Sequence, residues 1–81
     1  MNKLLVFSAT WCGPCKAFKP TLQQLDQDRI EYIDIDEMPE IREDYEVKSV
    51  PTVILVDEDG EELQRLVGGQ PLSTLQKLLD V

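Results

Sequence analysis

The residues of this chain best suited to chemistry are its two cysteines, Cys12 and Cys15, which lie in the stretch SATWCGPCKAF with Gly13 and Pro14 between them. Such a pair can be a redox-active dithiol, half of a metal site or a structural staple. A bridge between positions three apart closes a very short loop, and the loop-entropy model assigns little stabilisation to it. The spacing therefore favours a pair that is kept for its reactivity.

The metal-binding and inert alternatives have less support. A structural zinc site needs four nitrogen or sulfur ligands, whereas this chain has two cysteines and no histidine. Carboxylates or a second chain would have to complete such a site. Two inert buried cysteines are the other alternative, and the position of the pair at the expected start of a helix argues against it. We therefore expect a redox-active pair and no bound metal.

Helix geometry explains how the two thiols would divide the reaction. Residues i and i+3 on one turn lie about 5 Å apart on the same face, which suits the Cα separation of a disulfide. Cys12 precedes the first turn, whose free N–H groups favour an anion, so we expect it to be the nucleophilic thiolate. Cys15 lies one turn in, and we expect it to be the more buried, resolving thiol. Pro14 suits an early helical position, Gly13 leaves room for a substrate, and Trp11 offers a flat apolar surface.

The elements that must position this pair alternate in type along the chain. The runs KLLVFS and PTVILV are continuously apolar, which is typical of strands buried on both faces, whereas IEYIDI and ELQRLV are mixed. Phe18, Leu22 and Leu25 recur at helical spacing, which predicts a helix from about residue 13 to residue 28. Pro20 falls inside that helix and is expected to kink it. Further helices are expected from Pro39 and from Pro71.

The order of these elements, βαβαββα, predicts an α/β fold with a four-stranded mixed sheet. The apolar strands 3–8 and 51–56 belong at its centre, and the mixed strands 30–35 and 62–67 belong at its edges. A right-handed crossover makes the first two strands parallel. The turn DEDG makes the last two strands an antiparallel hairpin, and helices cover both faces. With 81 residues, the chain is expected to form one domain over 1–81.

Composition narrows the partners. The net charge is −8, which would repel nucleic acid and anionic lipid, so neither is expected to bind. No apolar run approaches the ~20 residues of a membrane span. The short run Leu4–Phe7 leads directly into the cysteine motif, where a secretory signal needs roughly 7–15 apolar residues before a cleavage site. We interpret the chain as a mature cytoplasmic protein and expect a monomer.

The stretch WCGPCK, residues 11–16, matches the active-site motif of the thioredoxin family residue for residue, and the chain resembles that family. Pro20 lies where the family has its kink proline. Val50 and Pro51, followed by a threonine, resemble its cis-proline loop, and Gly68 matches the glycine after its last strand. The resemblance covers nearly the whole chain.

This resemblance implies a thiol–disulfide oxidoreductase that reduces protein disulfides. It implies that Cys12 attacks, that Cys15 resolves the mixed disulfide, and that a flavin-dependent thioredoxin reductase using NADPH restores the dithiol. The chain itself would bind no cofactor beyond its redox-active disulfide. In the family the backbone before the cis-proline pairs with the substrate like an added strand. The expected substrate-binding residues are Trp11, Gly13, Pro14, Val50, Pro51 and Gly68.

Other functions remain open beside this one. A glutaredoxin-like protein recharged by glutathione fits the small size, although glutaredoxins usually carry a tyrosine in the spacer that is Gly-Pro here. A disulfide oxidase or isomerase usually has a histidine in the spacer and is exported. A redoxin can also serve as a binding subunit of another complex.

Three departures from the family pattern bear on fold and mechanism. The expected fold lacks the family's N-terminal βα unit, so the strand IEYIDI becomes an edge on which Glu31, Asp34 and Asp36 would discourage edge-to-edge pairing.

The other two departures lie beside the cysteines. Val6 stands where the family buries an aspartate beneath the disulfide, and Tyr32 replaces the lysine that pairs with it. The two losses are consistent, because a buried cation without a buried carboxylate has no partner. Ser8 replaces a frequent aromatic residue. Our hypothesis is that Cys15 loses its proton to water or to another group.

Overall fold

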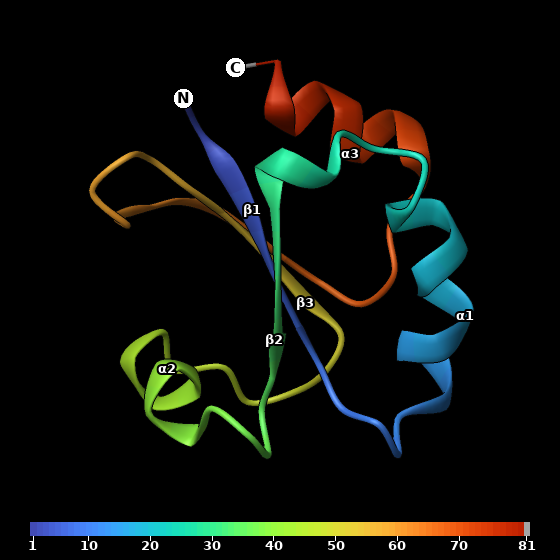
Figure 1. The fold of residues 1–81 in the computed structure, drawn as a ribbon, viewed down its shortest axis with the longest axis vertical. Coiled ribbons are helices and arrows are strands. Elements are labelled where there is room, and N and C mark those ends of the chain that lie inside the picture. The colour runs from blue at the N-terminus through green and yellow to red at the C-terminus, as the bar shows by residue number, and fades with distance from the viewer. Residues whose placement is uncertain (81) are drawn as a thin grey trace.

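The computed structural model describes residues 1–80, and its elements follow the predicted order (Figure 1). The last position of the predicted domain, residue 81, lies outside the described residues. The strands are β1 (Lys3–Ser8), β2 (Ile30–Asp34), β3 (Thr52–Val56) and β4 (Glu62–Val67). The helices are α1 (Gly13–Leu22), α2 (Pro39–Asp44) and α3 (Leu72–Leu79), with a short 3-10 turn, η1 (Gln27–Arg29), before β2.

The four strands form one mixed sheet in the order β2-β1-β3-β4. β1 runs parallel to β2 and antiparallel to β3, and β3 and β4 form the antiparallel hairpin. The two continuously apolar runs are therefore central and the two mixed runs lie at the edges, as predicted. The parallel register places Val6 opposite Tyr32 and Ser8 opposite Asp34. This pairing brings side chains that are far apart in sequence to the same end of the sheet.

Each face of the sheet carries its own core, because successive side chains of a strand point to opposite faces. Leu4 and Val6 of β1 pack on one face with the buried leucines of α1 and α3. Leu5 and Phe7 pack on the other face with residues of the α2 region, and this second core includes both cysteines. Helices thus cover both faces, which confirms the predicted fold class.

Helix α1 is shorter than the periodicity predicts. It ends at Leu22 rather than near residue 28, although Leu25 is buried in the core. The side chain of Gln27 donates hydrogen bonds to the carbonyl oxygens of Leu22 and Leu25, at 2.8 and 2.9 Å. These bonds satisfy carbonyl groups that a helix end leaves free. Leu25 keeps its place in the core without remaining in the helix.

A single guanidinium joins the two ends of the described chain. Arg29 donates to the carbonyl oxygen of Asn2 from Nε and Nη2, at 3.0 and 2.8 Å, and to that of Leu79 from Nη2, at 2.9 Å. The start of β1 and the end of α3 therefore lie side by side, as Figure 1 shows. Within residues 1–80, no helix is long and apolar enough to cross a membrane.

Candidate active site

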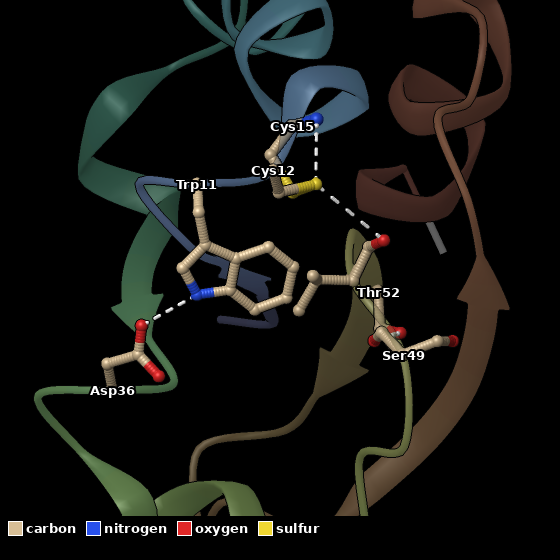
Figure 2. The surroundings of a disulfide bond; sticks show 7 residues. Trp11, Cys12, Cys15, Asp36, Ser49 and Thr52 are labelled. Atoms are coloured by element: carbon tan, nitrogen blue, oxygen red, sulfur yellow. Dashed lines mark hydrogen bonds between the residues drawn. A yellow bond between two sulfur atoms is a disulfide. The ribbon is translucent and has the colours of Figure 1, made fainter.

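The two cysteines form a disulfide at the start of α1 (Figure 2). Their Cα atoms are 5.3 Å apart, close to the spacing expected for one helical turn. Cys12 is the N-cap residue, and its Sγ accepts a hydrogen bond from the backbone N–H of Cys15 at 3.2 Å. This N–H and the other free N–H groups of the first turn favour negative charge on the Cys12 sulfur once the bond is reduced.

Both cysteines are buried, and the expectation that Cys15 is the more buried of the two is wrong. Cys12 is 5% exposed and Cys15 is 8% exposed. Cys12 is covered because its Sγ lies 3.8 Å from the carbonyl oxygen of Val50, in the loop before β3. Cys15 instead lines a cavity on the α1 side of the sheet. The position of a residue along the helix did not determine its exposure here.

The loop before β3 faces the disulfide. The Val50–Pro51 peptide bond is cis, as the resemblance implied. The hydroxyl of Thr52 donates to the carbonyl oxygen of Ser49 at 2.7 Å, which holds the loop closed. Val50 is half-buried and Pro51 is buried. The loop therefore presents the Val50 backbone, rather than a side chain, toward Cys12.

Gly68 belongs to the same surroundings although it is distant in sequence. Its N–H donates to the carbonyl oxygen of Pro51 at 2.8 Å, which fastens the end of β4 to the loop. The φ of Gly68 is +91°, a region that favours glycine over residues with a Cβ. Gly68 thus supports the Pro51 loop through its backbone.

Trp11 lies beside the disulfide and is 66% exposed. Its indole Nε1 donates to Oδ2 of Asp36 at 2.8 Å, and Figure 2 shows this bond holding the ring in place next to Cys12. Sequence reasoning assigned Asp36 only to the protection of an edge strand. The indole partner was missed because it is 25 positions away, and only the parallel pairing of β1 with β2 brings the two together.

Gly13 and Pro14 are exposed on the first turn of α1. A Cβ atom built on Gly13 would have no neighbour within 4 Å. The position is therefore open toward solvent, as expected for a surface that a substrate approaches. All six residues expected to bind substrate lie on the elements that surround the disulfide: the start of α1, the loop before β3 and the end of β4.

A cavity of about 650 Å³ lies between α1 and the β1–β2 pair and reaches Cys15. Val6, Ser8, Tyr32 and Asp34 contribute to its walls. Val6 is 1% exposed, so the position beneath the disulfide is apolar and buried. Sequence reasoning identified the substitutions at Val6, Ser8 and Tyr32 without foreseeing the cavity beside them or the part played by Asp34.

Tyr32 does not replace the missing lysine as a charged group. Its hydroxyl donates to Oε1 of Gln27 at 2.7 Å. Burial raises the pKa of the Tyr32 phenol, and the hydrogen bond with Gln27 opposes that shift. The phenol is therefore neutral at physiological pH. Among residues 1–80, no group of three or more His, Cys, Asp or Glu side chains is arranged to hold a metal ion.

Comparisons with known proteins agree on one family. The family model described as thioredoxin matches residues 1–81. A thioredoxin of Staphylococcus epidermidis is 46% identical over 83 aligned residues, which cover 96% of this chain and 79% of that protein. A thioredoxin of Staphylococcus aureus is 43% identical with the same coverage.

Solved structures show the same relationship. A thioredoxin variant of Halobacterium salinarum superposes with a TM-score of 0.88 at 34% identity, over 98% of this chain and 72% of that chain. A reduced thioredoxin of Schistosoma mansoni superposes with a TM-score of 0.85 at 27% identity, over 98% of this chain and 76% of that chain.

Proposed function

Because this chain belongs to the thioredoxin family and is a thiol–disulfide oxidoreductase, we propose that Cys12 is its nucleophile and Cys15 its resolving thiol. The observation that carries this assignment is the environment of the Cys12 sulfur. It accepts the N–H of Cys15 at the helix start and faces the open surface beside Trp11. Such surroundings favour a thiolate, which is the form that attacks disulfides.

The proposed reaction moves two electrons in two exchanges. The Cys12 thiolate attacks one sulfur of a substrate disulfide, which forms a mixed disulfide and releases one substrate thiolate. The Cys15 thiolate then attacks Cys12 Sγ, which forms the intramolecular disulfide and releases the second substrate thiolate. The substrate disulfide is reduced to two thiols, and the Cys12–Cys15 pair is oxidised.

We propose that protein substrates bind over the surface formed by Trp11, Gly13, Pro14, Val50, Pro51 and Gly68. Trp11 provides an exposed aromatic face, and a backbone carbonyl at Val50 lies within 3.8 Å of the Cys12 sulfur. A substrate backbone segment beside Val50 would form strand-like hydrogen bonds without regard to its side chains. This arrangement suits varied protein disulfides better than one small substrate.

Two cysteine variants test the assigned roles. Cys12→Ser should abolish the reduction of insulin disulfides, because no nucleophile is left at the open position. Cys15→Ser should form mixed disulfides that persist, and these can be isolated on non-reducing gels. Turnover by Cys12→Ser at the wild-type rate would refute the assignment.

We propose that electrons reach the pair from NADPH through a flavin-dependent thioredoxin reductase and that the chain binds no cofactor of its own. Membership of the family supports a reductase partner in general. Steady-state rates with NADPH and thioredoxin reductase, compared with rates in a glutathione system, decide the source. Faster recharging by glutathione would favour the glutaredoxin-like alternative.

We further propose that the protein works as a cytoplasmic monomer with one domain over 1–81. The two cores share a single sheet, which supports one folding unit. Sedimentation equilibrium tests the monomer, and fractionation of the source cells tests the compartment. Capture of a partner by the Cys12→Ser/Cys15→Ser variant would instead support a binding-subunit role.

A further inference from the structure

The cavity beside Cys15 supplies a route that the buried position beneath the disulfide does not. Val6 has no group that can accept a proton, and it is packed into the core. The cavity of about 650 Å³ reaches Cys15 and is also lined by Ser8 and Asp34. Cys12 is not among its lining residues. A route through this cavity would therefore serve the resolving thiol alone.

Asp34 is the only carboxylate among the residues that line this cavity. It is the last residue of β2 and lies opposite Ser8 in the parallel register, which places it at the cysteine end of the sheet. Its Oδ1 accepts hydrogen bonds from the backbone N–H groups of Asp36 and Glu37, at 2.8 and 3.3 Å. Both bonds use Oδ1, so Oδ2 is left to accept a proton from the cavity.

We propose that Asp34, acting through water in this cavity, takes up the proton of Cys15 when the mixed disulfide is resolved. The inference rests on the proposed role of Cys15 as the resolving thiol. A cavity needs roughly 10–15 Å³ of volume and two to four polar partners to hold one water molecule. The volume here exceeds that many times, and the Ser8 hydroxyl and the Asp34 carboxylate provide polar partners.

The proton and electrons balance in this step. The Cys15 thiol gives its proton to a water molecule, which passes a proton to Asp34 Oδ2. The Cys15 thiolate attacks Cys12 Sγ, the bond between Cys12 and the substrate sulfur breaks, and that sulfur leaves with the electron pair. The substrate thiolate takes a proton from solvent, and Asp34 returns its own proton to solvent through the cavity.

No other group that faces the cavity competes as an acceptor. Lys16 and Lys19 of α1 are cations, and both line the same space. Tyr32 of β2 is neutral, because burial raises the pKa of its phenol, and its hydroxyl donates to Gln27. The acidic side chains of Asp36 and Glu37, in the turn after β2, do not line the cavity. The aspartate at the end of β2 is thus the one acceptor at this position.

Stopped-flow reaction of the reduced protein with an aromatic disulfide such as Ellman's reagent separates the two exchanges. Attack by Cys12 gives a first release of coloured thiolate whose rate depends on reagent concentration. Resolution by Cys15 gives a second release whose rate does not. Asp34→Asn keeps an oxygen for the two turn hydrogen bonds. We expect it to slow the second release about tenfold or more at neutral pH, toward the loss of a general base, and to leave the first release unchanged.

The pH profile and a matched control distinguish proton transfer from a structural effect. The second release of wild type should show a carboxylate inflection that Asp34→Asn lacks. Glu37→Gln removes the same charge from the same turn outside the cavity, and it should retain both the rate and the inflection. Formate, which is small enough for the cavity, should accelerate the second release of Asp34→Ala and not that of wild type.

Three outcomes would overturn the inference. They are an unchanged second release in Asp34→Asn, equal slowing of both releases, and an Asp34→Ala variant that does not respond to formate. The proposed roles of the cysteines are tested separately in the same assay. A second release that persists in Cys15→Ser would refute those roles, whereas its absence beside an unaffected Asp34→Asn would refute only the role of Asp34.

Discussion

The two sulfur atoms of the disulfide are about equally buried but lie in different surroundings. Around Cys12 the closest groups are backbone: the N–H of Cys15 at 3.2 Å and the carbonyl oxygen of Val50 at 3.8 Å. Around Cys15 a cavity is lined by side chains, including those of Val6, Ser8 and Asp34. We call these the backbone side and the cavity side of the disulfide.

This difference teaches which half of the reaction a substitution can change. Backbone groups stay in place when side chains change, so the backbone side retains its chemistry as long as the helix start and the loop keep their positions. The cavity side has the chemistry of its lining residues. Loss of a buried acid at Val6 is therefore compatible with an intact nucleophile, provided that another group serves the resolving thiol.

The largest expected effect comes from placing an acid on the cavity side. Val6→Asp puts a carboxyl at a position that is 1% exposed, within an apolar core. We expect a loss of about 2–3 kcal/mol in the free energy of unfolding at neutral pH, measured by urea denaturation. Burial raises the pKa of such a carboxyl, so the loss should grow as pH rises above its unfolded value and shrink in acid.

The same variant tests whether the two acids are interchangeable. If Asp34 serves Cys15 through water, Val6→Asp in the Asp34→Asn background should restore part of the second release of Ellman's thiolate. A double variant as slow as Asp34→Asn, in protein shown to be folded by circular dichroism, would mean that the cavity side depends on the particular position of its acid.

A smaller loss is expected where the backbone side is supported. Gly68 has a φ of +91° and donates to the carbonyl oxygen of Pro51. Gly68→Ala should cost about 1–2 kcal/mol in unfolding free energy, because a Cβ is strained in that region. Gly69→Ala is the matched control. Its Cβ would meet Phe18 at an ordinary 3.8 Å, so its stability should stay near that of wild type.

The Trp11–Asp36 hydrogen bond should have an effect smaller than that. Asp36→Ala removes the acceptor of the indole N–H, and the KM for a protein disulfide should rise about threefold, in the range of one lost hydrogen bond. Trp11 is the only tryptophan of the chain, so a lower fluorescence anisotropy would report its released motion. Glu37→Ala is the control, and an equal rise in KM there would point to charge rather than to the indole contact.

The smallest effect should lie outside both sides of the disulfide. Arg65 donates to both carboxylate oxygens of Glu62 and to the carbonyl oxygens of Tyr45 and Glu46. The hydrogen bond with Arg65 lowers the pKa of Glu62. A lowered carboxyl pKa gives stability that is present above the unfolded pKa and is lost as pH falls through the folded one.

Glu62→Gln should therefore reduce stability by less than about 1 kcal/mol at neutral pH, since the pair is partly exposed. The difference from wild type should vanish in acid, as urea titrations at several pH values would show. A change in either release of Ellman's thiolate would contradict the separation of this pair from the reaction.

The sequence predicted the strands well because their patterns are local. KLLVFS and PTVILV are buried on both faces and became the central strands β1 and β3. The end of α1 was not predicted, because Leu25 satisfies the helical spacing and is buried without being helical. The capping bonds from the Gln27 side chain that end the helix have no counterpart in a hydrophobic period.

The candidate site was predictable where it depends on a contiguous motif and not where it depends on register. The cysteine pair and the proline loop were found from their own residues. The partnership of Trp11 with Asp36 and the approach of Asp34 to Cys15 both require the alignment of β1 with β2, which places Ser8 opposite Asp34. One residue of slip would turn those side chains to the other face of the sheet.

The Arg29 guanidinium described above has a consequence for rearranging the gene. It binds the carbonyl oxygens of Asn2 and Leu79, so positions near the two ends of the chain share one ligand. A short Gly/Ser linker could join them, and new termini could open in the exposed turn at Glu58 and Asp59. A circular permutant of that design would keep the WCGPC segment uncut and every strand whole. The order in which the elements leave the ribosome would change, while the disulfide and both of its sides would be encoded unaltered.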